Sequence, residues 1–448
     1  MNPDPNFITS LFNIDMADVE SLVTRSDEES VTYDIKLKRK FMTCPYCRGP
    51  MIGHGRKTKK IDHPVLRNRK GYIIYHANRY ICKRCGKTCF ENNPFAMTGF
   101  NSSTLLLQHA MQHLGNLNYT LDMISKELNI SNTQLNTYVD SFITIPRLSL
   151  PESLGIDELY SKTLSRKNAT FLCILVDNEH RCVNDVLDSR SKYFLERHFA
   201  NTPRDERAGV RFVTIDMWEP YRDVAEEFFP NASVAVDPFH VINHLCDDFD
   251  TLRISLMNQC DYNSNGYYLL KKWNWLLTKS DIDLDNEKEL NHRFGLYLNR
   301  RDIRNLIFET FPVLHTAYEL KELYRRFNRI ASYEDACKKI DDFRKMFSDS
   351  NIRQYDEFVR ILTNWRQEII NSFQRPYDNR KQSNAFTENI NGKLRTYLSV
   401  SRGISNFPRF RKRVLYALNP KINYALTAKL HSEKRKGKAR GPYEKPRD

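Results

Sequence analysis

Two stretches, Ser153-Leu-Gly-Ile-Asp157-Glu-Leu159 and Val210-Arg-Phe-Val-Thr-Ile-Asp216, decide the fold. Both have the short, apolar, β-branched composition of buried strands, and each carries an aspartate toward its carboxyl end. Two further runs of this kind, 169–178 and 182–188, lie between them and are followed by a helical run at 191–202. These four strands and one helix predict a mixed α/β sheet in this part of the chain.

The succession of elements continues beyond Asp216. Residues 221–229 have helical periodicity, 232–237 have the pattern of a strand, and 239–257 have that of a helix. The whole order is the one expected of an RNase H-like α/β fold, in which Asp157 and Asp216 would end their strands at one edge of the sheet. Aspartates often cap strands without any catalytic role, so the functional prediction depends on the acids acting as a set.

Carboxylates gathered at one sheet edge suit phosphodiester cleavage. Two hard cations about 3.5 to 4 Å apart activate the nucleophile and relieve charge on the leaving oxygen, and carboxylate oxygens are the ligands that hold such cations. The sequence contains no Walker loop, no nucleophile elbow and no GxGxxG fingerprint. We therefore expect neither nucleotide hydrolysis nor acyl transfer.

Length and charge narrow the class of protein. A chain of 448 residues is long enough for about two to four domains. The net charge of +14 favours a polyanionic partner, either nucleic acid or an anionic membrane surface. No stretch approaches the roughly 18 apolar residues of a membrane span, and the N-terminus shows no basic leader or apolar run. We expect a cytoplasmic, nucleoid-associated protein that does not enter membranes.

Four of the ten cysteines form two CxxC pairs, Cys44 with Cys47 and Cys82 with Cys85, in an N-terminal region placed at 1–99. They predict a zinc ribbon over 44–85, because zinc takes four ligands in a tetrahedron and each CxxC turn supplies two thiolates. An inserted hairpin at 61–80 accounts for the wide spacing. Four buried structural thiols are the alternative. Four neighbouring residues are expected to be bystanders rather than ligands: His54, His63, His76 and Cys89.

Residues 100–150 predict a helix-turn-helix DNA-binding domain. A helical run at 103–114 precedes two short helices, 119–128 and 129–138, for which Thr120 and Ser131 would be the N-caps. The second helix would present amide side chains near its N-terminal end, where they suit adenine edges in a major groove. These side chains are Asn132, Gln134 and Asn136. Any two amphipathic helices joined by a short turn give the same pattern, so the pattern alone leaves DNA recognition open.

Five motifs follow in order along the rest of the chain: Asp216-Met-Trp-x-x-Tyr221, Phe229-Pro-Asn-Ala232, Val236-Asp237-x-Phe239-His240, Ser383-Asn384-Ala-Phe-Thr-Glu388-Asn-Ile-Asn391-Gly-Lys393-Leu-Arg395, and Ser401-Arg-Gly-Ile-Ser-Asn406-Phe407-Pro-Arg-Phe410-Arg411. Together they resemble the signature of the ISL3 family of bacterial insertion-sequence transposases. The resemblance covers about 35–419, since the CxxC pairs and the helix pair also stand where that family has them. The family often has asparagine-glycine where Asn384-Ala385 stands here, a mild departure that leaves Glu388 itself untouched.

The resemblance implies a DDE catalytic triad of Asp157, Asp216 and Glu388, which would hold two Mg²⁺ or Mn²⁺ ions. It also implies an RNase H-like core interrupted by an all-α insertion. The core would occupy 151–242 and, with its final helices, 381–428, and the insertion would occupy 243–380, because 172 positions separate Asp216 from Glu388.

Asp237 competes with Asp216 for the second catalytic position, because both follow strands and both lie in matching motifs. We prefer Asp216, since Mutator-like relatives carry a Cys-x-x-His element later in the chain, in the slot that Asp237-Pro-Phe-His240 occupies. His240 then binds a phosphate or orients a nucleotide, or is simply a capping or core histidine. Within the insertion, Trp273 and Trp275 either stack on a splayed base or belong to the core.

A basic strip follows the third acid. On the predicted helix 387–396, Glu388, Asn391 and Arg395 share one face, so a metal ligand and phosphate-binding groups can align there. Between 393 and 413 the sequence has seven Lys or Arg and no acid, which is typical of a surface that follows a DNA backbone. The further DNA contacts expected from this strip are Lys393, Arg402, Arg409, Arg411 and Arg413. A basic tail at 429–448 is expected to be a flexible, DNA-contacting segment.

The leading hypothesis is a DNA transposase. The ribbon and helix pair would bind the terminal inverted repeats as double-stranded DNA, and the acids would cut and rejoin strands in target DNA with two Mg²⁺ or Mn²⁺ ions, while zinc would be structural. A homodimer or higher oligomer is expected, because two ends must be handled together. The alternatives are a non-catalytic, sequence-specific DNA-binding regulator derived from a transposase and, third, an RNase H-like nuclease.

Overall fold

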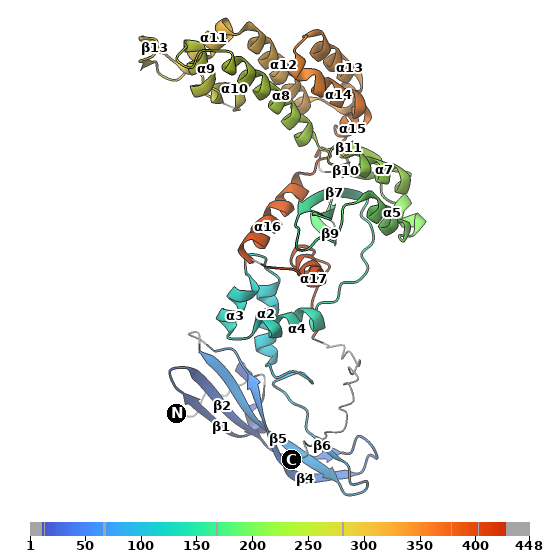
Figure 1. Cartoon of the computed structure of the whole chain (residues 1–448). Coiled ribbons are helices and arrows are strands. Elements are labelled where there is room, and N and C mark those ends of the chain that lie inside the picture. The colour runs from blue at the N-terminus through green and yellow to red at the C-terminus, as the bar shows by residue number, and fades with distance from the viewer. Residues whose placement is uncertain are drawn as a thin grey trace, which may run out of the picture. The chain divides into compact units, whose positions relative to one another are not determined.

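The computed structural model describes residues 11–12, 14–65, 69–166, 169–279, 282–377, 379–401 and 403–426. Arg402 and the predicted basic tail 429–448 lie outside these residues. The chain divides into two compact units, shown with their elements labelled in Figure 1. The first unit contains residues 1–147 and 394–448, and the second contains 148–393. The predicted final core segment, 381–428, is therefore shared between the two units.

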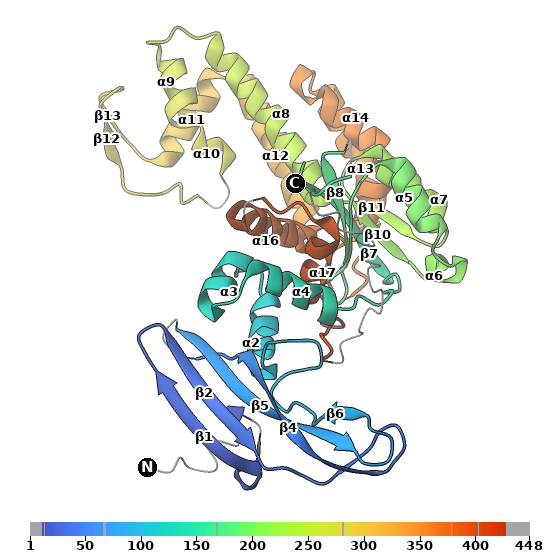
Figure 2. The same cartoon turned by 60° about the horizontal axis from the view of Figure 1, so that its bottom comes forward.

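A six-stranded sheet forms the N-terminal part of the first unit, preceded by a short 3₁₀ turn at Met16–Asp18 (Figure 2). Its strands are β1 (Val19–Ser26), β2 (Ser30–Leu37), β3 (Met42–Thr43), β4 (Pro50–Asp62), β5 (Lys70–Cys82) and β6 (Thr88–Phe90). They are ordered β1-β2-β5-β4-β3 with β6 also on β5, and only β2 and β5 run parallel. Alternate residues of β5, including Ile73, Tyr75 and Ala77, are buried, as expected of a strand with one face on a core. The predicted hairpin at 61–80 is longer in the structure, where β4 begins at Pro50 and its partner β5 ends at Cys82.

The helices of the first unit have clear local causes. They are α2 (Thr104–Leu114), α3 (Leu121–Leu128), α4 (Asn132–Phe142) and α17 (Phe407–Leu418). Thr120 caps α3 by accepting a hydrogen bond from the Met123 amide, and Ser131 caps α4 through the Gln134 amide, so both predicted caps are confirmed. Asn129 ends α3 in the left-handed region, with φ of 53°, which turns the chain sharply into α4. α17 packs against α4.

A five-stranded mixed sheet forms the centre of the second unit. Its strands are β7 (Ser153–Tyr160), β8 (Phe171–Asp177), β9 (Cys182–Leu187), β10 (Phe212–Ile215) and β11 (Ser233–Val236), in the order β11-β10-β7-β8-β9. β10 runs parallel to β7 and β11, whereas β8 is antiparallel to β7 and β9. The intervening helices are α5 (Lys192–Ala200), α6 (Arg204–Ala208) and α7 (Glu219–Phe228). Every strand and long helix predicted between 153 and 257 is confirmed to within a few residues.

The long segment after β11 is mainly helical, as predicted. Its helices are α8 (Pro238–Asn258), α9 (Asn265–Lys272), α10 (Trp275–Thr278), α11 (Arg300–Thr310), α12 (Pro312–Ile330), α13 (Tyr333–Asp349), α14 (Asp356–Asn364) and α15 (Arg366–Asn371), with a 3₁₀ turn at Arg353–Tyr355. A small hairpin of β12 (Glu289–Asn291) and β13 (Leu296–Leu298) was not predicted. The boundary between the two units falls within the next helix, α16 (Ala385–Ser401), after Lys393.

One hydrophobic core connects the sheet with the helical segment. It includes Ile156 and Ile215 of the sheet and an aromatic cluster centred on Tyr324, whose ring contacts Phe343 and Phe358 edge to face. Trp273 and Trp275 are partly buried and pack against this core, which favours their interpretation as core residues. Among the described helices, none combines the length and apolar character that crossing a membrane requires.

Candidate active site and zinc site

Strand register brings three aspartates to the same level of the central sheet. Ile215 is opposite Val236, so the next residues, Asp216 and Asp237, leave adjacent strands together. Thr214 is opposite Gly155, which puts Asp216 level with Asp157, two residues further on each strand. The expectation that Asp157 ends its strand was wrong, because β7 continues to Tyr160 by pairing with β8. The pairing of β10 with β7 ends just before this level, at Thr214 and Gly155.

Asp157 is the most strongly held of these carboxylates. Only 7% of the residue is exposed, its Oδ1 accepts the Glu158 amide at 2.7 Å, and its Oδ2 accepts the Asn391 side-chain amide at 2.9 Å. Burial raises the pKa of Asp157 to about 7, and the nearby charge of Asp216 acts in the same direction. A bound cation would offset exactly this cost of burying a charge, so the carboxylate is suited to a metal site.

Asp216 and Glu388 are half-buried and face the same histidine. Asp216 Oδ1 accepts the Met217 amide at 2.6 Å and lies 3.3 Å from His240 Nδ1. Glu388 lies in the first turn of α16, and its Oε1 is 3.9 Å from His240 Nε2. His240 therefore lies between the second and third predicted acids, with one ring nitrogen near each of them.

Asp237 is a fourth carboxylate of the cluster. It is 1% exposed and caps α8, where its Oδ1 is 3.4 Å from the Phe239 amide. Its Oδ2 is buried and has no hydrogen-bond partner among the described residues. The pKa of Asp237 is raised to about 6 by burial, with Glu388 contributing in the same direction. The ligand atoms of Asp237, His240 and Glu388 lie within 4.8 Å of one another, an arrangement that can hold a metal ion.

Two asparagines attach α16 to β7 on either side of Glu388. The side chain of Asn384 donates to the carbonyl of Ile156 at 3.2 Å, and that of Asn391 donates to Glu158 O at 3.1 Å as well as to Asp157. Asn391 is 1% exposed, and its side-chain amide is bonded to Asp157, so its DNA contact stays a prediction that the burial does not favour. Asn384 was missed as a functional position, although its place one helical turn before Glu388 was a usable signal.

The four CxxC cysteines meet at one end of the first unit's sheet. Their sulfurs lie within 4.8 Å of one another, with Cys44 Sγ 3.7 Å from Cys85 Sγ and Cys47 Sγ 3.4 Å from Cys82 Sγ. The backbone amide of Cys85 contributes most to lowering the pKa of Cys82 to about 6, which favours the thiolate. The set fits a structural zinc site of four thiolates.

The predicted bystanders near the zinc site have other partners. The sulfur of Cys89 contacts the sulfurs of Met42 and Met51, His63 Nδ1 is 3.0 Å from Ser103 Oγ, and His76 Nε2 is 2.9 Å from Asp34. His54 is exposed and is not part of the four-sulfur group.

Some of the residues predicted to contact DNA are accessible to solvent, and others are bonded within the first unit. Asn132, Lys393 and Arg395 are exposed, while Asn136 and Arg411 are half-buried. The Gln134 amide nitrogen instead donates within the unit, to Ser102 at 2.6 Å and to Tyr138 at 3.0 Å. Arg409 is held by the carboxylate of Asp140 at 2.7 Å.

Arg413 is only 3% exposed, which does not favour its predicted phosphate contact. Its guanidinium donates to the Tyr397 hydroxyl at 2.8 Å and to the Tyr119 carbonyl. The pattern of basic residues could not distinguish this buried cation, which ties α17 to the start of α3, from its exposed neighbours.

Known proteins resemble the part of the chain that contains this site. Residues 154–414 match the ISL3 family, which is described as a transposase family. The transposase for insertion sequence element IS1001 of Bordetella parapertussis is 23% identical over 261 residues, which cover 57% of this chain and 63% of that protein. The chain thus spans less than two thirds of that relative's length. Since the family match covers more than half of the chain and includes all four acids, this protein belongs to the ISL3 family of insertion-sequence transposases.

Proposed function

We propose that this protein is a DDE transposase with an RNase H-like core, which cleaves and joins DNA strands at transposon ends. The observation that carries the proposal is the convergence of Asp157, Asp216 and Glu388 on one site from two adjacent strands and one helix. The strand order, with the second strand antiparallel and the fourth beside the first, also supports the RNase H-like core.

Asp157, Asp216 and Glu388 would hold two Mg²⁺ or Mn²⁺ ions, which when bound would activate the attacking oxygen and stabilise the leaving one. The chain's own contribution is orientation. Asn391 fixes one oxygen of Asp157 and the Glu158 amide holds the other. His240 lies close enough to Asp216 and Glu388 to hold them at a constant separation before DNA arrives.

We assign the second catalytic position to Asp216 rather than Asp237. Asp237, and not Asp216, forms the three-residue metal-binding arrangement with His240 and Glu388, which speaks for Asp237 as a ligand. However, Asp216 is half-buried beside Asp157, whereas Asp237 is 1% exposed and caps α8. Asp216 has the more accessible carboxylate of the two, and Asp237 is engaged as the N-cap of α8, so we place Asp216 in the catalytic position.

The first unit would supply DNA binding. The two short helices α3 and α4, joined by the left-handed turn at Asn129, support a helix-turn-helix, in which Asn132 and Asn136 of α4 would contact base edges. We propose that this pair and the zinc ribbon bind the terminal inverted repeats. Two such ends would be joined by at least a dimer, because each chain carries one cluster of acids.

Cleavage of end DNA tests the assignment directly. Purified protein with Mn²⁺ and a labelled duplex of its own element's end should release a cut strand, and Asp216→Asn should lower the rate by at least about a thousandfold while leaving DNA affinity unchanged. Asp237→Asn should retain measurable cleavage. Wild-type protein that binds the end without cutting it would instead identify a regulator, and equal loss in both variants would refute the choice of Asp216.

A further inference from the structure

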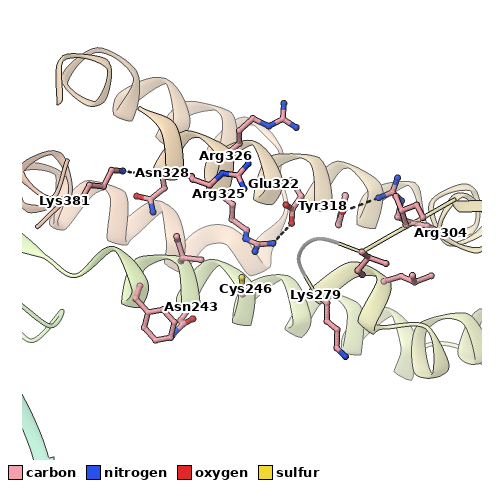
Figure 3. A pocket seen from close by; sticks show the side chains of 16 residues that line it. Asn243, Cys246, Lys279, Arg304, Tyr318, Glu322, Arg325, Arg326, Asn328 and Lys381 are labelled. Carbon is pink, nitrogen blue, oxygen red and sulfur yellow. Dashed lines mark hydrogen bonds and ion pairs between the residues drawn. The ribbon is translucent and has the colours of Figure 1, made fainter. Parts of the chain in front are cut away.

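A cavity of about 760 Å³ lies in the helical part of the second unit, outside the cluster of acids. Figure 3 shows labelled side chains of α12, among them Arg325 and Arg326, across from Asn243 and Cys246 of α8. A volume of this size is typical of a site for a small molecule or for one or two nucleotides, and is too small to admit a duplex. Any nucleic acid in it must therefore be a single strand.

The lining of the cavity is strongly cationic. Among the described residues that line it, Glu322 is the one carboxylate, and it is already paired with Lys321 at 2.9 Å and Arg325 at 2.8 Å. Six cationic side chains line the cavity: Lys279, Arg304, Arg325, Arg326, Arg329 and Lys381.

Three of these cations have no acidic partner among the residues that the structure describes. Arg326 and Arg329 lie on the same face of α12 as Glu322, at helical spacings of four and seven residues, and are exposed. Neither they nor Lys279 form an ion pair with any residue that the structure describes. Such unpaired cations around one hollow are the typical means of binding phosphodiester oxygens.

Two residues that line the cavity are close in sequence to residues of the proposed active site. Phe239 lines the cavity and precedes His240, which contacts Asp216 and Glu388. The Phe239 ring is unusually exposed for phenylalanine, at 52%. Lys381 also lines the cavity, and it lies seven residues before Glu388 in the sequence. An exposed aromatic ring beside unpaired cations is the combination that holds a single-stranded nucleotide.

We propose that this cavity binds the single-stranded DNA segment next to the scissile phosphate, with its phosphates on Arg326, Arg329 and Lys279 and one base on Phe239. This inference rests on the proposed function, because it takes DNA to be the substrate. It adds a role that cleavage chemistry does not require, namely recognition of an unpaired strand at the end being processed.

Binding to random-sequence DNA tests the proposal without cleavage or inverted-repeat recognition. In a Glu388→Gln background, anisotropy would compare a blunt duplex with the same duplex carrying a short single-stranded extension of either polarity. We expect about fivefold or greater preference for an extension. The double variant Arg326→Ala/Arg329→Ala should lose this preference and lower the salt dependence of extension binding by about 0.7 for each lost phosphate contact.

Matched variants separate the cavity from general charge. Lys338→Ala/Lys339→Ala removes the same charge from exposed positions of α13 that do not line the cavity, and should keep the preference. Phe239→Leu should weaken it and Phe239→Tyr should restore it. Circular dichroism and thermal melting would confirm that each variant is folded.

The outcomes distinguish this inference from the proposed function. An extension preference that both double variants lose equally, or that Arg326→Ala/Arg329→Ala retains, would overturn the cavity assignment even if end DNA is cleaved. Tight binding of a free deoxynucleotide with no preference between blunt and extended DNA would also overturn it. If only the variants of cavity residues lose the preference for an extension, the cavity assignment is supported, even if cleavage of end DNA fails.

Discussion

Asn391 holds the carboxylate of Asp157, the first of the proposed catalytic acids, through its side-chain amide. Its amide nitrogen bridges Asp157 Oδ2 and the Glu158 carbonyl, and the side chain is almost fully buried. Removing the amide leaves Asp157 held only by its neighbour's backbone, so its free oxygen can rotate away from the geometry that a metal requires.

We therefore expect Asn391→Ala to lower metal-dependent cleavage by about 10- to 100-fold, with a raised metal concentration for half-maximal rate and unchanged DNA affinity. Metal titrations of the cleavage rate measure this. Asn389→Ala is the matched control, because Asn389 is an exposed asparagine two residues away on the same helix. Comparable losses in both variants would show that α16, rather than the contact to Asp157, is responsible.

His63 gives the first unit a pH-dependent stability. The ring is buried against Phe12 and Ser103, its Nε2 has no hydrogen-bond partner among the described residues, and burial lowers its pKa to about 4. The unfolded chain binds a proton near pH 6.5, so the folded state is favoured above that pH and loses this advantage as the pH falls toward 4.

Between pH 7 and pH 5 this single group should remove about 2 kcal/mol from the free energy of unfolding of the first unit. Urea unfolding at the two pH values measures it. His63→Asn should reduce the difference by about that amount, and His54→Asn, at an exposed position, should leave it unchanged. A His63→Asn protein with the full wild-type pH dependence would refute the assignment.

At the scale of elements, the four-cysteine site lies at an end of the sheet where the hydrophobic core is small. The core around the cysteines is small, consisting of Met51, Tyr80, Cys44 and Cys82 with partly buried neighbours, whereas the main core of this sheet surrounds Ile35 and Tyr75. A zinc ion bound by the four cysteines would supply stabilisation that so few apolar side chains cannot.

Cys82→Ser should lower zinc content from about one ion per chain to near zero and should raise amide exchange in β3, β6 and the adjoining end of β4, leaving β1 and β2 protected. Metal analysis and hydrogen exchange measure the two effects. Cys89→Ser should retain zinc, because that sulfur contacts methionines instead of joining the four-sulfur group. Full zinc content in Cys82→Ser would exclude the four-thiolate site.

At the scale of the whole molecule, the helical segment and the sheet with the acids share one hydrophobic core, so we expect them to unfold together. Their buried side chains make one continuous core, in which Tyr324 of α12 is 1% exposed and contacts the rings of Phe343 and Phe358. Damage in the helices should therefore reach the strands that position Asp157 and Asp216.

Tyr324→Ala should cost about 3 to 5 kcal/mol of unfolding free energy and should increase amide exchange in β7 and β10 as well as in α12. Tyr193→Ala, at a position that is 74% exposed, should cost less than about 0.5 kcal/mol. Faster exchange limited to the helices would show that they unfold independently of the sheet.

The amino-acid sequence by itself determined the order of strands and helices from 153 to 257, the caps Thr120 and Ser131, the zinc cysteines and the set of candidate acids. These features depend on periodicity, capping and spacing, which act over a few residues. The small β12–β13 hairpin and the sheet around β1 and β2 escaped prediction, because short or edge strands carry weak local patterns.

Only the tertiary structure decided which of these residues act together. Strand register, which joins positions 59 and 80 residues apart, put Asp157, Asp216 and Asp237 at one level. The docking of α16 on β7 buried Asn391 against Asp157 and brought Glu388 to His240, while the packing of α17 buried Arg413 among its exposed basic neighbours. Such contacts follow from the burial of whole faces by segments distant in the chain, and no local pattern distinguishes an arginine that faces DNA from one that faces the core.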